Sequence, residues 1–561
     1  MIWRYRLILF ILVGSFFLII ARLFYWQVVR AEELYFLGKT QYGYKMVVLP
    51  KRGEIRTTDG YPIVANKPSY LVFAQPQNIS KKDKKKIVSL LPSILELDIA
   101  SISASLSRDL LWVPLKSNID VEEKKEIEKL EFPGIGFEEV STPFYPEASM
   151  AAHLIGFVGK NDLGEDKGYF GLEGYYERQL RGKAGKLVET KDALGRPILA
   201  KIDQESGAIN GRSLILSIDR AVQFTVERAL KKGIERYQAS GGMVGVMDPK
   251  TGNILAMASF PGFDPREYQK YDEEIFKNPF ISSVYEPGST LKALVMASAL
   301  DAKVVKPNTK CDICGGPITI GEYQIKTWNN KYMKDITMVE TIQHSDNTGM
   351  VFISQSLGLD KMLDYLEKFG IGETTGIDLQ GEVAPAIRDR NYWYPIDLAT
   401  AGFGQGISIT PIQLLSGFSA IANGGKRMEP HVVSAIETPD KKRIPIEPKV
   451  LGTPISAATA KVMTEILVNA VDKGEAKWAK PKGYRIAGKT GTAQIPIAGH
   501  YDANKTIASF MGFAPADDPK FVMLVIVDRP ITSIYGSETA APIFFDIARD
   551  LLTYFGIPPT E

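Results

Sequence analysis

The chain has 561 residues, of which 45% are hydrophobic and 24% are charged. This is an ordinary globular composition with room for two or three domains and at least one large core. The 67 basic and 65 acidic side chains give a formal net charge of +2, which provides no electrostatic reason for nucleic acid or another polyanion to bind.

The N-terminal thirty residues differ in kind from the rest. Residues 7–29 form an apolar stretch that continues past Arg22 and reaches the roughly 20 residues that span a bilayer. Arg4 and Arg6 precede it, so the positive-inside tendency places residues 1–6 in the cytoplasm and the bulk of the chain outside. A cleaved signal peptide is the alternative, but the stretch is long and has no clear small-x-small cleavage site. We therefore expect a single-pass anchor in the cytoplasmic membrane.

Residues 30–208 are expected to form a pedestal domain that follows the anchor. Residues 51–65 predict two short strands joined by an Asp-Gly turn. Residues 80–130 are helical and charged in pattern, and such charge runs are usually solvated helix faces. The polar residues 201–211 predict a linker that ends this domain.

Residues 209–561 are expected to form a second domain that mixes helices and strands. Strands are predicted near both ends of this segment and helices between them, which indicates one α/β layer domain with a sheet assembled from distant parts of the sequence. The predicted strands are residues 213–219, 243–247, 254–258, 507–513 and 521–527, and the predicted flanking helices are residues 221–237 and 541–555.

Two cysteines, Cys311 and Cys314, lie in a Cys-Asp-Ile-Cys run. A local disulfide fits an exported domain, whereas a zinc site needs two further ligands that only four scattered histidines and the carboxylates could supply. We interpret the pair as structural. His153 has no acidic or cysteine partner at ligand spacing and is interpreted as a core or capping histidine. No metal and no cofactor are expected.

The strongest local signal for chemistry is Ser289 followed by Lys292. A helix that begins after Pro287 and Gly288 places the hydroxyl and the amine on one face. The apolar residues 293–300 continue that helix into a core, so the serine is expected in the first turn of a buried helix. A nucleophile beside its own base is what covalent catalysis requires.

Two further motifs follow the Ser-x-x-Lys pair. They are Ser345-Asp346-Asn347 and Lys489-Thr490-Gly491-Thr492, and in this order the three match a signature of serine acyltransferases that react with penicillin. Another Lys-Thr-Gly run, residues 250–252, precedes the serine and lies at a Pro-containing hairpin turn, which accounts for its composition. We therefore assign the chemistry to the run that begins at Lys489, which follows a strand-like segment.

Each residue type in the three motifs has a chemical role. Serine needs a base, and Lys292 can be that base if burial and the nearby cation Lys489 lower its pKa. Ser345 can pass a proton toward a leaving amine, and Asn347 can hold the lysine or a substrate amide. The third motif suits a substrate carboxylate through Lys489, Thr490, Gly491 and Thr492. The backbone amides of Ser289 and Thr492 are candidates for an oxyanion hole.

The chain resembles the class B penicillin-binding proteins over nearly its whole length. The resemblance rests on the three motifs and on further runs at residues 52–55, 144–146, 171–173, 402–406, 410–413 and 422–425. Residues 56–60 depart from the usual Asp-Arg-Asn/Asp-Gly ending of the first membrane-proximal motif. No glycosyltransferase module precedes the pedestal, so a class A protein is excluded.

This resemblance implies a fold and an activity. The implied fold is an α/β (α+β) transpeptidase domain like that of serine β-lactamases, with an antiparallel central sheet flanked by helices, an elongated α+β pedestal and one transmembrane helix. The implied enzyme acylates Ser289 with a peptidoglycan stem peptide, expels the terminal D-alanine and transfers the acyl group to an amine on a neighbouring stem. β-Lactams are expected to acylate the same serine.

The runs at residues 285–290 and 402–406 look more like the division-specific than the elongation-specific subgroup. By resemblance only, the partners are stem peptides and lipid-linked precursors, a SEDS-family glycosyltransferase and other membrane proteins of the division machinery. Hydrolysis, as in a carboxypeptidase or a β-lactamase, is the alternative chemistry, and the long pedestal argues against it. A β-lactam sensor would need an intracellular module, yet only six residues precede the apolar run; an inactive scaffold would not keep all three motifs.

Overall fold

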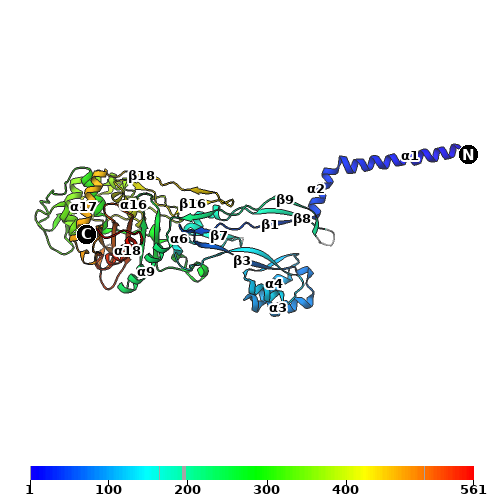
Figure 1. Cartoon of the computed structure of the whole chain (residues 1–561), viewed down its shortest axis with the longest axis horizontal. Helices are drawn as coiled ribbons and strands as arrows, with labels where there is room; N and C mark the ends of the chain where they lie inside the picture. The colour runs from blue at the N-terminus through cyan, green and yellow to red at the C-terminus, as the bar shows by residue number, and fades with distance from the viewer. Residues whose placement is uncertain (1, 163, 192–196, 498–499, 561) are drawn as a thin grey trace. The chain divides into compact units, whose positions relative to one another are not determined.

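The computed structural model describes residues 2–162, 164–191, 197–497 and 500–560 (Figure 1). The chain divides into two compact units, each assembled from separate stretches of sequence. One comprises Met1–Lys51 and Arg181–Gly211, and the other comprises Arg52–Leu180 and Arg212–Glu561.

The smaller unit consists of the N-terminal helix and a small sheet. Helix α1 (Ile2–Phe24) continues through a π-helical turn (Tyr25–Val29), and neither has buried side chains. Together they contain an 18-residue stretch with a mean hydropathy of 2.7. This length and composition suffice to cross a membrane, as expected for the anchor. The rest of the unit comprises α2 (Ala31–Tyr42) and an antiparallel sheet of β1 (Gly43–Val48), β8 (Gly185–Lys191) and β9 (Pro197–Ser206).

The polar segment predicted as a linker is partly a strand. Strand β9 runs through residue 206 and pairs with β8, so only residues 207–211 lie outside the strand. Strand pairing is made by backbone groups, and it therefore does not require an apolar sequence.

A small α/β lobe fills the part of the larger unit between residues 75 and 135. Its helices are α3 (Lys81–Leu95), α4 (Ile99–Ser107) and α5 (Val121–Glu128). The lysines at the start of α3 are largely exposed while Ile87 and Leu91 are fully buried, so the charge run is a solvated face as predicted. Strand β4 (Val113–Ile119) interrupts the predicted helical region.

One sheet joins the pedestal to the C-terminal half of the chain. It has the strand order β17-β16-β10-β2-β3-β4, with β5 (Ile135–Phe144) also paired to β3. The predicted hairpin is β2 (Ile55–Arg56) and β3 (Pro62–Ala74), and β2 also pairs in parallel with β10 (Ser213–Leu216). Strands β16 (Val433–Glu437) and β17 (Arg443–Pro445) complete the sheet from the far end of the sequence.

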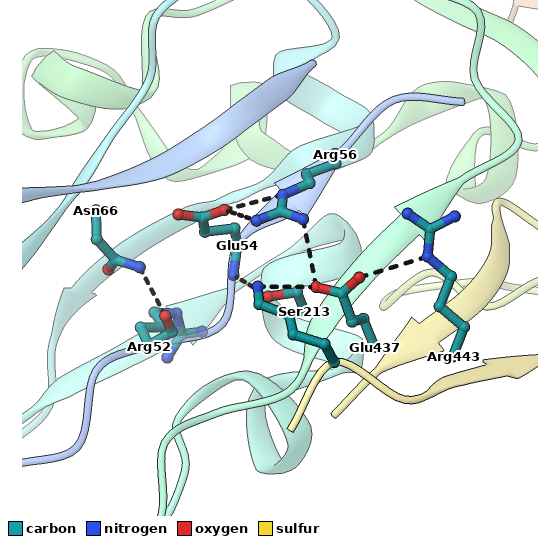
Figure 2. A network of polar contacts seen from close by, with 8 residues as sticks. Arg52, Glu54, Arg56, Asn66, Ser213, Glu437 and Arg443 are labelled. Atoms are coloured by element: carbon teal, nitrogen blue, oxygen red, sulfur yellow. Dashed lines mark hydrogen bonds and ion pairs between the residues drawn. The ribbon is translucent and has the colours of Figure 1, made fainter. Parts of the chain in front are cut away.

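Charged side chains connect the same strands (Figure 2). The Arg56 guanidinium donates to Glu54 at 2.9 Å and to Glu437 at 3.3 Å, and Arg443 donates to Glu437 at 3.4 Å. Glu437 is 5% exposed, and these cations together with Lys441 hold its pKa below the ordinary range although burial opposes them. The first membrane-proximal motif therefore fastens the pedestal to β16.

The central sheet of the C-terminal half is antiparallel, with the order β12-β11-β21-β20-β19. Its strands are β11 (Gly241–Met247), β12 (Ile254–Phe260), β19 (Ala487–Ile497), β20 (His500–Ala514) and β21 (Phe521–Asp528). The central neighbours β11 and β21 come from opposite ends of the domain, as the sequence predicts. Strand β19 is an edge, so one side of it is free to meet the catalytic elements.

Helices cover both faces of this sheet. Because strand side chains alternate between faces, Val244 and Val246 pack with α9 (Arg220–Tyr237) and α18 (Ala540–Tyr554), while Met247 faces the larger core on the other side. That core contains the helices that carry the site: α11 (Lys292–Asp301), α12 (Met338–Gln343), α13 (Asn347–Leu357), α14 (Leu359–Lys368), α15 (Pro395–Ala401), α16 (Pro411–Ala422) and α17 (Ala457–Lys473). The predicted layered fold is confirmed.

Two smaller expectations are also resolved. Cys311 and Cys314 form a disulfide, and both side chains are buried. His153 is buried and bonds the Ile275 carbonyl at 2.9 Å, as expected for a core histidine. Burial lowers the His153 pKa to about 4, so the ring is neutral and its Nε2 donates that bond.

Candidate active site

Ser289 lies in a short 3-10 turn, Gly288–Thr290, immediately before α11. The sequence predicts the serine inside the first α-helical turn, but the α-helix begins only at Lys292. Ser289 is partly exposed, whereas Thr290 and Lys292 are fully buried. The turn therefore leaves Ser289 partly accessible and directs the Lys292 amine into the core.

Glycines allow this turn to pack closely. Gly288 has a φ of +55°, a region that favours glycine, and its N–H donates to the Gly404 carbonyl at 3.0 Å. A Cβ added to Gly404 would lie 2.0 Å from the Gly288 oxygen. The 402–406 loop thus packs directly against the backbone of the serine turn.

Lys292 joins the first motif to the second. Its Nζ donates to the Ser345 carbonyl at 2.7 Å and to Asn347 Oδ1 at 2.8 Å, and it lies 3.3 Å from Ser345 Oγ. Burial, followed by the nearby charge of Lys489, lowers the Lys292 pKa well below the ordinary lysine value. A deprotonated amine in this position can accept the proton of a serine.

The second motif is a strained turn between two helices. Ser345 has a φ of +54°, which is unusual for serine, and its side chain is buried. Asp346 caps α13 by accepting from the Gly349 N–H at 2.8 Å, so the middle residue of the motif is structural. Asn347 is oriented by its Nδ2, which donates to the Lys326 carbonyl at 3.0 Å. The turn thereby presents Ser345 and Asn347 to the lysine.

The third motif lies on the edge strand β19. Lys489 is 2% exposed, and burial lowers its pKa to about 8 while Glu475 opposes the shift. The Lys489 Nζ donates to the carbonyl and to the hydroxyl of Thr490, both at 3.1 Å. Thr492 Oγ1 accepts from the Gly536 N–H at 3.0 Å, which leaves the hydroxyl proton of Thr492 available to a ligand.

Gly491 brings this strand close to the serine turn. A Cβ at this position would lie 2.9 Å from Thr290 Cγ2 and 2.3 Å from Ser509 Oγ. The glycine in the Lys-Thr-Gly run is therefore required by packing between β19 and the turn. Other contacts agree, because a Cβ at Gly288 would approach the Thr492 carbonyl at 3.1 Å.

The structure thus brings the three predicted motifs close together, and the earlier Lys-Thr-Gly run takes no part in these contacts. Lys250 lies in the β11–β12 turn and forms an exposed ion pair with Asp518. The arrangement pairs a buried amine with a neighbouring serine and places a second cation on a strand edge. This chemistry suits transfer of an acyl group from a substrate that carries a carboxylate.

Two family models match the chain. The penicillin binding protein transpeptidase domain matches residues 242–549, and the penicillin-binding protein dimerisation domain matches residues 47–216. The chain belongs to the penicillin-binding protein family. A dimerisation domain followed by a transpeptidase domain is the arrangement of a class B member, as expected from its motifs.

Full-length relatives agree with this assignment. This penicillin-binding protein is 35% identical to stage V sporulation protein D of Bacillus subtilis, over 100% of this chain and 87% of that protein. It is 30% identical to peptidoglycan D,D-transpeptidase FtsI of Escherichia coli K12, over 99% and 92% of the two chains. These relatives place it in the division-type subgroup.

Solved structures share the fold. A peptidoglycan synthetase from Bifidobacterium adolescentis superposes with a TM-score of 0.75 at 24% identity, covering 92% of this chain and 98% of that one. Penicillin Binding Protein 2X from Streptococcus thermophilus superposes with a TM-score of 0.74 at 23% identity, covering 92% and 81%.

Sequence reasoning missed a carboxylate in the site of this penicillin-binding protein. Glu475 follows α17 and is half-buried, and its charge raises the pKa of both Lys292 and Lys489 against the effect of their burial. Burial raises the pKa of Glu475 itself, and the two lysines oppose that shift. In the sequence Glu475 stands among alternating charges typical of a surface loop, so no local pattern indicates that it belongs to the site.

A second missed carboxylate, Glu286, braces the serine turn. It accepts from the Gly406 N–H at 3.1 Å and from the Tyr501 hydroxyl at 3.1 Å. Burial raises the Glu286 pKa, and burial together with this carboxylate raises the Tyr501 pKa to about 12. Glu286 stands three residues before Ser289, and this proximity was the one available signal.

Proposed function

We propose that this chain is a peptidoglycan D,D-transpeptidase in which Ser289 is acylated and Lys292 is its base. The observation that carries the proposal is the fully buried Lys292 amine, held by oxygens of Ser345 and Asn347 next to the serine turn. A lysine so far from water favours its neutral form, and a neutral amine is what a serine nucleophile needs.

In the first half-reaction, Lys292 accepts the proton of Ser289 as the serine oxygen attacks the carbonyl of the penultimate D-alanine. The backbone amides of Ser289 and Thr492 would stabilise the developing oxyanion. Ser345 relays the proton from Lys292 to the departing nitrogen, so the C–N bond breaks and free D-alanine leaves. Lys489, Thr490 and Thr492 bind the terminal carboxylate of the stem, and Gly491 keeps the strand close to Ser289.

In the second half-reaction, the amine of a neighbouring stem attacks the serine ester. Its proton passes to Lys292 and then to the serine oxygen as the ester bond breaks, so the enzyme returns to its starting state with a new amide crosslink. A β-lactam enters the first half-reaction as a substrate analogue and remains on Ser289.

The domain plan gives this reaction a location. We infer that residues 1–6 lie in the cytoplasm and that residues 7–29 anchor the chain in the membrane. The pedestal, residues 30–208, and the transpeptidase domain, residues 209–561, then lie outside the membrane. The relatives named FtsI and stage V sporulation protein D support a role in septal wall synthesis. A SEDS-family glycosyltransferase and other division proteins are the proposed partners of the anchor and pedestal, and lipid-linked precursors are the proposed source of new strands.

The test of the serine is covalent labelling with a fluorescent penicillin. The wild-type chain and a Ser298→Ala control should label, because Ser298 is a buried serine of α11 that bonds the Leu294 carbonyl. Ser289→Ala should not label. If it does, the assignment of the nucleophile is wrong.

The test of the reaction is product analysis with a stem pentapeptide and an amine acceptor. A transpeptidase forms the crosslinked amide in proportion to acceptor concentration. Free tetrapeptide as the sole product at high acceptor concentration would instead identify a hydrolase, the alternative chemistry for the same three motifs.

A further inference from the structure

The loop that precedes α12 contacts two of the three motifs. It follows a small hairpin of β13 (Ile318–Ile320) and β14 (Tyr323–Ile325). Its first residues form a closed turn, in which Thr327 Oγ1 donates to the Lys331 carbonyl at 3.1 Å. Trp328 lies in this turn, and its side chain is 45% exposed. The turn therefore presents the indole ring in a defined position.

Two hydrogen bonds join this turn to the second motif, and they flank Ser345. The Trp328 Nε1–H donates to the His344 carbonyl at 3.2 Å. The Lys326 carbonyl accepts from Asn347 Nδ2 at 3.0 Å. The turn thus holds the backbone immediately before Ser345 and the side chain two residues after it.

The bond at His344 acts on the strained backbone of Ser345. A φ of +54° is costly for serine and persists only where surrounding contacts hold it. Rotation about φ turns the planar peptide group that carries the His344 carbonyl, and rotation about ψ turns the one that carries the Ser345 carbonyl. Trp328 binds the first carbonyl, and Lys292 binds the second at 2.7 Å. Lys292 changes its charge when it accepts a proton, whereas an indole N–H does not, so the Trp328 bond persists through each proposed proton transfer.

The indole ring also reaches the third motif. It packs edge-on against Tyr535, with the ring centroids 5.7 Å apart and an interplanar angle of 64°. The next residue, Gly536, donates its N–H to Thr492 Oγ1 at 3.0 Å. The two aromatic rings therefore connect the Ser345 turn with the strand that carries Lys489, and Tyr535 restrains the indole that holds the turn.

We propose that Trp328 is a positioning residue for acylation of the serine and that Tyr535 keeps it in place. The indole acts through the backbone of Ser345 and not on the reacting atoms. This inference rests on the proposed roles of Ser289, Lys292 and Ser345. Loss of the indole N–H is expected to slow the chemical step and to leave ligand binding unchanged, because the bond is made to backbone that the ligand does not replace.

The test is saturation kinetics of acylation by benzylpenicillin, measured by stopped flow on the full-length protein in detergent. These data separate the dissociation constant of the non-covalent complex from the limiting rate constant of acylation. Trp328→Phe keeps a ring and removes the N–H. It should lower the limiting rate constant about three- to tenfold, while the dissociation constant stays within twofold.

The matched control is Trp393→Phe. Trp393 Nε1 also donates to a backbone carbonyl, that of Arg388, at 3.0 Å, but neither residue belongs to the three motifs. This variant should leave both constants unchanged. Tyr535→Ala should lower the limiting rate constant about two- to fivefold, and Tyr535→Phe, which keeps the ring, should restore it.

Thermal melting confirms that each variant is folded. A folded Trp328→Phe variant that reacts at the wild-type rate, or an equal loss in Trp393→Phe, overturns the positioning role. A raised dissociation constant with an unchanged rate constant also overturns it, because the indole would then contact the ligand. These results leave the proposed function intact, whereas absence of acylation in the wild-type chain would overturn the proposed function and this inference with it.

Discussion

The two lysines of the active site are both buried, but their surroundings differ. Lys292 at the start of α11 is surrounded by oxygens of the Ser345 turn, yet burial and the charge of Lys489 lower its pKa well below the ordinary value. Lys489 on strand β19 bonds only Thr490 among the described residues, and its pKa falls to about 8.

The difference shows how one fold obtains a base and a cation from the same side chain. The helix start removes its lysine from water completely, and the second cation penalises a further charge there. The strand edge keeps its lysine beside Glu475, which favours the charged form. Burial and the neighbouring cation thus favour the neutral form of Lys292, whereas Lys489, with a pKa of about 8, keeps its charge at neutral pH.

The largest expected effect comes from removing the base. Lys292→Gln should lower the second-order rate constant of penicillin acylation by about 10³-fold or more, because general base catalysis contributes about 10²–10⁴-fold. Stopped-flow labelling measures it, and melting temperature confirms folding. A loss of less than tenfold would mean that another group accepts the serine proton.

The next effect comes from the strand cation, and the chain supplies its own control. Lys489→Ala should reduce kcat/KM for a carboxylate-bearing stem peptide by about 10- to 100-fold, because a charge-assisted hydrogen bond is worth about 1.5–3 kcal/mol. Lys250→Ala alters the other Lys-Thr-Gly run and should leave kcat/KM unchanged. Similar losses in both variants would show that the effect is not specific to the Lys489 position.

A smaller effect is expected from Glu475, whose charge acts on both lysines. The Glu475 charge raises the pKa of both lysines, so Glu475→Gln lowers both. Activity needs neutral Lys292 and charged Lys489, and the whole bell-shaped profile of kcat/KM should therefore move toward lower pH. We expect roughly a two- to fivefold loss at pH 8.5 with little loss at pH 7. A profile that moves toward higher pH would contradict the assigned roles.

The smallest effect on the acylation rate is expected from Glu286, which contacts the loop that packs against the serine turn. Glu286→Gln should reduce the acylation rate by about three- to tenfold, since it weakens two hydrogen bonds that brace the 404–406 loop and Tyr501 without touching either lysine. Tyr501→Phe removes one of those bonds and should give a smaller loss. A change in the pH profile of Glu286→Gln would show that this carboxylate acts on the lysines instead.

The same contrast explains what could be predicted from the sequence. The three motifs are short, ordered and chemically specific, so Ser289, Lys292, Ser345 and Lys489 were identifiable. The alternating strands and the closing helix were also recognisable because periodicity reports which face is buried. Local pattern therefore sufficed to predict the groups that we propose for the chemistry.

The parts that were missed depend on tertiary contact. Glu475 is a common residue in a charged loop, and its importance comes only from the fold that brings it near two lysines. The 3-10 turn at Ser289 is set by its packing against Gly404, more than one hundred residues away. Likewise, the pairing of β2 with β10 carries no local signature, because backbone groups make it.

The most direct test of the account is a titration of the two lysines themselves. Nuclear magnetic resonance of the enzyme with ¹³Cε-labelled lysine, assigned with Lys292→Gln and Lys489→Ala, reports the protonation of each amine. We predict that the Lys292 pKa lies well below that of an ordinary lysine and that Lys489 titrates near pH 8. An ordinary pKa for Lys292, together with a Lys489 that is neutral at pH 7, would contradict the account.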